Sequence, residues 1–147
     1  MAEVGCLKDS HIQNLEVNQQ SLITGNQIIE GEQSINGSLK FTDGGAIEQS
    51  SSKSTGVTLN TRSGKITTHN ESLAANGVVS FTVTNSKITA GDVVLANHVS
   101  GGTLGAYVIN INTFTSTGFN VTITNISADA LTDALVIHFV AFTATIA

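Results

Sequence analysis

The sequence predicts an all-β protein in which an N-terminal extended, glycine-punctuated β arm is followed by a C-terminal antiparallel β-sandwich or barrel. Two observations predict this class. In the first third of the chain, Gly25, Gly31 and Gly37 recur at every sixth residue. Beyond it, short runs rich in Val, Ile, Thr and Phe alternate with Gly or Asn, as strands alternate with turns in a sandwich or barrel.

Large apolar residues in the arm follow the same six-residue step. They are Val17, Ile23, Ile29, Ile35 and Phe41. Because six is an even number, these side chains fall on one face of an extended chain, whereas a helix of 3.6 residues per turn would scatter them. One such row cannot enclose a core, so we predict that these five residues contact identical arms in a homotrimer.

Two other interpretations of the repeat stay open. One is a single-chain β-meander whose glycines are evenly spaced by chance. The other is the left-handed hexapeptide β-helix of certain acyltransferases, which use many more coils, place the glycine differently and supply a catalytic His between subunits. A trimeric lyase or acyltransferase would need a cluster of His, Asp or Glu between its subunits.

The predicted organisation is an arm over residues 1–41, a linker over 42–56 and a β-sandwich domain over 57–147. The linker assignment depends on its richness in Gly, Ser and Lys. At the start of the domain, residues 57–70 are predicted to form a hairpin that turns at Arg62–Lys65.

The following strands are predicted from alternation and turn residues. They cover 78–85, 92–97, 106–112 and 119–125, with a glycine-rich loop at Ser100–Gly105 and a turn at Ser116–Gly118. Residues 134–143 are apolar on both faces and predict a central core strand. Residues 127–133 suggest at most one helical turn, capped by Ser127.

The composition argues against some kinds of binding partner. The net charge is −5 and the six Lys and Arg residues are scattered, which argues against a nucleic-acid surface. The longest apolar stretch, 134–142, is too short to cross a bilayer, so we expect no membrane partner. The chain has no proline to protect its edge strands, and its low charge suits packing against copies of itself.

No catalytic or metal-binding pattern is recognisable in the sequence. The four histidines lie in separate segments, and we would test only His98, beside the glycine loop, for a metal or symmetry-axis ion, whereas His138 is expected in the core. Asp129 and Asp133 are four residues apart and could bind calcium, but a solvated loop is the favoured interpretation. We therefore predict a protein that is not an enzyme, with no catalytic residue, no cofactor and no metal.

Part of the sequence resembles a known class. Residues 54–142, which contain STGVTLNTRSGKITTHNESLAANGVVSFTVTNSKI and FNVTITNISADALTDALVIHFVAF, resemble a domain in structural proteins of tailed phages, cyanophages especially. The opening MAEVGCLKDSHIQNLEVNQQSLITGNQIIEGEQSINGSLKFTDGG is similar to the glycine-punctuated leaders of phage fibre and capsid-decoration proteins. The resemblance implies a virion protein, commonly trimeric, whose N-terminal part attaches to the particle.

Length favours one of two virion roles. Residues 17–41 reach at most about 80 Å when fully extended, which suits a capsid decoration (cement) protein bound to the major capsid protein. The alternative is a tail-fibre component or adaptor that touches a host surface glycan through the loops at 100–105 and 116–118. With Cys6 as its only cysteine and no signal peptide, the protein is expected in a virion assembled in the host cytoplasm.

Overall fold

The computed structural model describes residues 22–25 and 27–143. The chain divides into two units, Met1–Ser38 and Leu39–Ala147. Within the first unit, the chain bends at Gly25, Gly31 and Gly37, once in each six-residue repeat, and its described residues form no strand or helix. Glycine has no side chain to hinder such a bend, which explains its place in the repeat.

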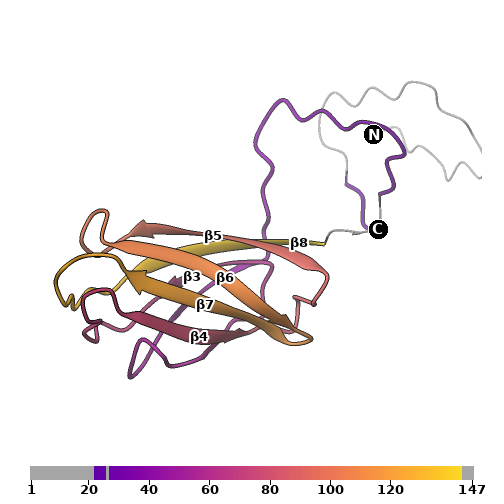
Figure 1. Ribbon diagram of the computed structural model, residues 1–147. Coiled ribbons are helices and arrows are strands. Elements are labelled where there is room, and N and C mark those ends of the chain that lie inside the picture. The colour runs from indigo at the N-terminus through magenta and orange to yellow at the C-terminus, as the bar shows by residue number, and fades with distance from the viewer. Residues whose placement is uncertain (1–21, 26, 144–147) are drawn as a thin grey trace, which may run out of the picture. The chain divides into compact units, whose positions relative to one another are not determined.

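The second unit is a β-sandwich of two mixed, four-stranded sheets (Figure 1). The strands are β1 (Gly44–Glu48), β2 (Val57–Thr58), β3 (Ser63–Thr67), β4 (Val78–Thr84), β5 (Asp92–Ser100), β6 (Tyr107–Thr115), β7 (Gly118–Asn125) and β8 (Val136–Thr143). Sheet A has the order β1-β3-β8-β5 and sheet B the order β2-β4-β7-β6. The prediction of an all-β protein with a C-terminal sandwich is confirmed. The β1–β3 and β2–β4 pairs are parallel, so neither sheet is purely antiparallel.

The core lies between the two sheets and follows from the period-two alternation of the strands. Phe81 and Val83 of β4 face inward from sheet B, and Ile137 and Phe139 of β8 face inward from sheet A, all at most 4% exposed. Phe119 of β7 joins the two layers, because its ring lies edge-on to Phe139 with centroids 5.5 Å apart. Burial of each such side chain contributes about 1.5–3 kcal/mol to stability.

The last described strand, β8, lies within the range 134–143 predicted as a central strand, and it is central in sheet A, between β3 and β5. Only one of its faces is fully buried, since Ile137, Phe139 and Ala141 point into the core while Val140 is half-buried on the outer face. The expectation that His138 lies in the core is wrong. Its position alternates with Ile137 and Phe139, so its side chain is exposed on the outer face.

The predicted hairpin over 57–70 is also wrong. β2 pairs with β4 in sheet B, whereas β3 pairs with β1 and β8 in sheet A. The chain therefore crosses from one sheet to the other between these strands. The crossing places Val57 and Ile66 on opposite sides of the same core, where both are buried.

Two further segments differ from prediction. No helical turn forms at 127–133; instead Ser127 Oγ donates to Asn125 Oδ1, and Leu131 pairs with Leu73 in an isolated bridge. Residues 42–56, predicted as a linker, contain β1 and the buried side chains of Gln49 and Lys53. Local hydrogen bonds explain this order, because Gln49 Nε2 donates to the carbonyl of Lys53 and folds the serine-rich segment back on itself.

Candidate functional site

The apolar row of the arm is the first candidate surface. Among its described members in the first unit, Ile23 is 51% exposed, Ile29 42% and Ile35 48%. The neighbouring Leu22 and Ile28, which are out of phase with the row, are 87% and 85% exposed. Each described repeat unit thus presents a half-covered isoleucine to possible partners. Val17 lies outside the described residues.

Phe41, the last predicted member of the row, belongs to the second unit and already has a partner there. Its ring lies edge-on to Phe142 of β8, with centroids 5.4 Å apart. The two rings line a hollow of about 380 Å³ together with Arg62, Ala141 and Thr143. Phe41 remains 42% exposed, so the contact with Phe142 leaves part of the ring available to another chain.

An apolar surface continues from these rings across the outer face of sheet A. We call it the sheet A patch, and it consists of Phe41, Val93, Leu95, Val140 and Phe142. Val93 is the direct neighbour of Phe142, and Leu95 is the direct neighbour of Val140, across the antiparallel β5–β8 pair. The sequence holds a signal for this patch, since VVLAN in β5 has apolar residues at both phases of the alternation.

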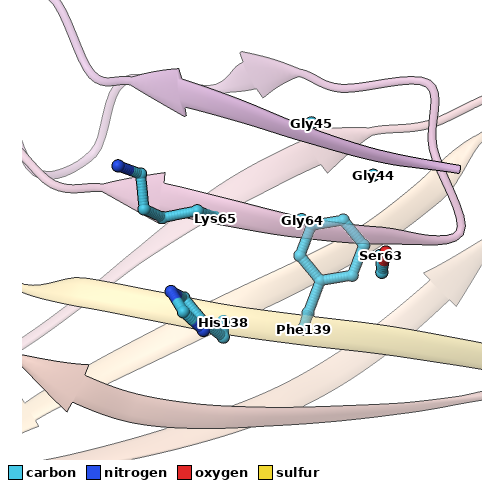
Figure 2. Close-up of a pocket in the computed structure, with 7 residues that line it drawn as sticks. All are labelled: Gly44, Gly45, Ser63, Gly64, Lys65, His138 and Phe139. Carbon is cyan, nitrogen blue, oxygen red and sulfur yellow. The ribbon is translucent and has the colours of Figure 1, made fainter. Parts of the chain in front are cut away.

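The middle of the same face carries a shallow hollow of about 280 Å³ across β1, β3 and β8. Figure 2 shows Lys65 and His138 among its lining residues, on neighbouring strands where they are direct cross-strand partners. Core packing leaves no room for a side chain at Gly64, because a Cβ there would come within 2.6 Å of the buried Leu59 and Phe139.

The polar groups in this hollow do not form a nucleophile with its base. Ser63 Oγ donates instead to the backbone carbonyl of Asp43, at 3.1 Å. No hydrogen bond links Ser63, Lys65 and His138 within the described part of the chain. The described side chains that line this hollow form a mixed polar surface.

The outer face of sheet B has the opposite character. Ser80 and Thr122 hydroxyl groups lie 2.7 Å apart, and Thr82 Oγ1 donates to Asn120 Oδ1 at 2.9 Å. Asn112 Nδ2 donates to the same Thr122 hydroxyl group at 2.7 Å. These cross-strand hydrogen bonds pair several polar groups of the face inside one chain. The same face also carries two exposed apolar residues, Val78 at 61% and Val108 at 40%.

The loop at 100–105 is fastened by Asp133. Its Oδ2 atom accepts hydrogen bonds from the Thr103 N–H at 2.9 Å, from Thr103 Oγ1 at 3.0 Å and from Tyr107 Oη at 2.9 Å. The backbone N–H of Thr103 is the main cause that holds the pKa of Asp133 below its ordinary value of 3.8. Gly101 and Gly102 have φ angles of 75° and 76°, a conformation that favours glycine.

His98 has a structural role in this loop. Its Nε2 atom lies 3.1 Å from the carbonyl oxygen of Ser100 and 2.7 Å from that of Gly101. It lines a hollow of about 300 Å³ with the loop residues, including the fully exposed Leu104. The loops at 100–105 and 116–118 lie at opposite ends of β6, so one chain does not bring them together as a glycan site.

Buried ionic groups fasten the ends of sheet A, and the sequence analysis missed them. Lys53 Nζ donates to the carbonyls of His69 at 2.6 Å and Asp133 at 2.5 Å. Burial lowers the pKa of Lys53, and the charges of Asp133 and Glu71 oppose that shift. No local pattern marks this lysine, because its two carbonyl partners lie 16 and 80 residues away.

Arg62 and Asp92 form the second ionic fastening. Arg62 Nη1 lies 3.1 Å from Asp92 Oδ2, which also accepts a hydrogen bond from the Thr89 N–H at 2.9 Å. That backbone hydrogen bond is the main cause that lowers the pKa of Asp92, and Arg62 adds to it. The pair connects the start of β5 with the segment just before β3.

The described residues contain no group of three His, Cys, Asp or Glu side chains that could hold a metal ion. In the same part of the chain, no helix is long and apolar enough to cross a membrane. The candidate surfaces described above are the apolar row, the sheet A patch and the His98 loop. Comparison with known proteins adds no constraint, since no protein-family model, no curated protein and no solved structure matches this chain.

Proposed function

We propose that this protein is a structural component of a tailed-phage particle, where it serves as a trimeric decoration (cement) protein on the capsid surface. The observation that carries the proposal is the half-exposed row of Ile23, Ile29 and Ile35. Three apolar side chains at a fixed step are costly to leave in water, and identical arms can cover one another's rows around a common axis. The resemblance of residues 54–142 to structural proteins of tailed phages is the reason for assigning the protein to a phage particle.

The proposed mechanism is avidity. Three arms that are linked in one trimer engage neighbouring sites on the major capsid protein, and each bound arm raises the effective concentration of the next. The β-sandwiches project from the particle. Linked attachment resists the outward pressure of packaged DNA better than three separate attachments of the same affinity.

The location is tested by the copy number of this protein in purified particles, measured by quantitative mass spectrometry against the major capsid protein. Hundreds of copies per particle are expected for a capsid decoration protein. A few tens or fewer would place the protein in the tail. Absence from the particles would overturn the virion assignment.

The role of the row is tested in the full chain with matched double variants. Ile23→Ser with Ile29→Ser removes two members of the row, whereas Leu22→Ser with Ile28→Ser removes apolar side chains one position earlier in each repeat. We expect the first variant to lose trimer formation and particle binding by at least about tenfold, which corresponds to about 1.4 kcal/mol. Equal losses in the two variants would contradict the assignment of the row.

A tail-fibre component or adaptor is the second candidate. It is favoured by the hollow of about 300 Å³ beside His98, whose loop is fastened by Asp133 and so is held ready to bind. Since the loop at 116–118 lies at the other end of β6, a glycan would contact the 100–105 loop alone. Binding of the isolated protein to host cells, abolished by Leu104→Asp, would favour this role.

A further inference from the structure

The four edge strands of the sandwich are not equally protected against pairing with another chain. β2 is only two residues long. β1 has five residues, begins with two glycines and ends with a charged glutamate. β6 is interrupted by a register shift between Asn112 and Thr115, and Thr113 has a φ angle of 51°. Short length, charge and irregular pairing are known ways to prevent edge-to-edge association.

β5 has the least of this protection. It has nine residues, and its register with β8 is regular from Asp92 to His98. Its outward side chains include Val93 at 41% exposure and Leu95 at 56%. The charge of Asp92 at its first position is already paired with Arg62. Within the described residues, β5 pairs with β8 alone, so the backbone groups of its other edge have no strand partner.

We propose that β5 pairs in antiparallel fashion with β5 of a second copy, which joins two sandwiches across a two-fold axis. A second copy fits this edge because the regular segment is complementary to itself. With the axis at Leu95, the middle of residues 92–98, each Asp92 lies opposite His98 of the other copy, so no like charges face each other. Val93 then lies opposite Asn97, and Leu95 lies opposite its own copy.

The expected affinity follows from the size of the contact. A standard stable interface covers about 800 Å² on each partner, and the edge of one nine-residue strand with its row of side chains is smaller. We therefore expect dissociation constants in the micromolar range rather than the nanomolar range. Such a contact is weak in solution and becomes effective where copies are held close together.

This contact is separate from the proposed arm trimer, and neither requires the other. The isoleucines of the row, Ile23, Ile29 and Ile35, lie in the first unit of the chain, whereas β5 lies in the second. If both contacts form, trimers are joined in pairs through their sandwiches. If only the trimer forms, the β5 contact is wrong while the proposed function stands. If a dimer forms without trimers, the β5 contact stands while the proposed arm trimer is wrong.

The first experiment is sedimentation of the full-length protein over about 1–100 µM, the range in which micromolar affinities are measured. Leu95→Lys is expected to abolish the two-fold contact, halving the mass of the largest species, because two lysines would face each other across the axis. Thr82→Lys places the same charge on the outer face of sheet B and is expected to leave the mass unchanged. Both positions are exposed, so circular dichroism should report the same fold for both variants.

The second experiment tests the register by disulfide formation. In a chain that carries Cys6→Ser, Leu95→Cys is expected to give a covalent dimer under mild oxidation, because directly opposite residues have Cβ atoms about 4.5–5.5 Å apart. Thr82→Cys in the same chain is the control. The inference is overturned if Leu95→Cys gives no more dimer than this control, or if Leu95→Lys leaves the mass unchanged.

Discussion

The two outer faces of the sandwich differ in how their side chains are satisfied. On sheet B, hydroxyl and amide groups bond across the strands, as between Thr82 and Asn120 at 2.9 Å. On sheet A, the exposed Leu95 lies directly opposite Val140, and the exposed Val93 lies directly opposite Phe142, so both cross-strand pairs are apolar. Polar groups that already bond within one chain gain little from a partner, whereas apolar pairs on a surface gain from being covered. We therefore expect the proposed association on sheet A.

The two sheets also differ in how their ends are fastened. Sheet A uses ionised side chains, namely Lys53 and the Arg62–Asp92 pair. Sheet B uses neutral amides, since Asn85 follows β4, Asn125 ends β7, and both are fully buried. Ionised groups respond to pH, whereas amides do not. The stability of the sandwich should therefore depend on pH mainly through sheet A and the loop that Asp133 holds.

The largest expected loss of stability follows from removing a buried amide of sheet B. Asn125 Nδ2 donates to the carbonyls of Leu73, Ala74 and Asp129, all within 3.0 Å. Asn125→Ala leaves these groups without that donor and should lower the free energy of unfolding by about 3 kcal/mol. Asn120→Ala, on the half-exposed outer face, is the control and should cost less than about 1 kcal/mol. Urea denaturation measures the free energy of unfolding of both variants. Equal losses would mean that the buried Asn125 stabilises the sandwich no more than Asn120 on the outer face.

A slightly smaller effect is expected at the buried lysine. Lys53→Met fills the same space but leaves the carbonyls of His69 and Asp133 without their ammonium donor, and should cost about 2 kcal/mol. Lys65→Met, on the outer face of sheet A, should change the free energy of unfolding by less than about 0.5 kcal/mol. If Lys53→Met were as stable as the wild type, the ionic fastening would contribute nothing beyond packing.

Acid should weaken the ionic fastenings selectively. The pKa values of Asp92 and Asp133 are lowered in the folded protein from an ordinary value of 3.8, so their stabilisation is complete above that value and is lost as the pH falls below it. Each carboxylate can contribute a slope of at most about 1.4 kcal/mol per pH unit. Asp92→Asn should make the acid limb of the stability curve shallower, whereas Asn125→Ala should shift the curve without changing its slope.

The smallest effect concerns the tyrosine that joins Asp133 to β6. Burial is the main cause that raises the pKa of Tyr107 from 10.0 to about 12, and the hydrogen bond to Asp133 adds to it. A raised pKa gives a stabilisation that is complete below pH 10 and is lost as the pH rises toward 12. Tyr107→Phe should cost about 1 kcal/mol at neutral pH.

The alkaline test of Tyr107 depends on a difference between two proteins. Lys53 has a lowered pKa and so contributes a pH dependence of the opposite sign. It is present in both the wild type and Tyr107→Phe, and it cancels when the two curves are subtracted. The gap between the curves should narrow above pH 10; a constant gap would mean that the hydroxyl group titrates alike in the folded and unfolded chains.

Much of the sandwich could be predicted from local alternation. Val79, Phe81 and Val83 point inward at alternate positions of the strand predicted over 78–85, and β5, β6, β7 and β8 lie where apolar periodicity places them. The hairpin at 57–70 failed because β2 and β3 pair with strands that are distant in sequence, and period-two alternation does not say which sheet a strand joins. The prediction that His138 lies in the core was wrong for a related reason. Side chains alternate along a strand, so the buried Ile137 places His138 on the outer face of the sheet.

The candidate surfaces were less accessible to prediction. The arm row was read from its spacing, and the contacts assigned to Ile23, Ile29 and Ile35 stay a prediction. Lys53 was hidden in a serine-rich segment whose composition is typical of a linker, and its partners are contributed by distant segments. The sheet A patch needs the register of β5 with β8, because Val93 and Phe142 become neighbours only in that pairing.

The central position of β8 has a consequence for how the protein folds. Although β8 is the last strand in sequence, it separates β3 from β5, and its pairing partners in β3 lie about 70 residues earlier. Sheet A cannot close until β8 has been synthesised, and contacts of such long range slow folding. Until then β5 lacks its pairing partner in sheet A, so the nascent chain needs protection from aggregation most strongly at the strand through which we expect finished copies to associate.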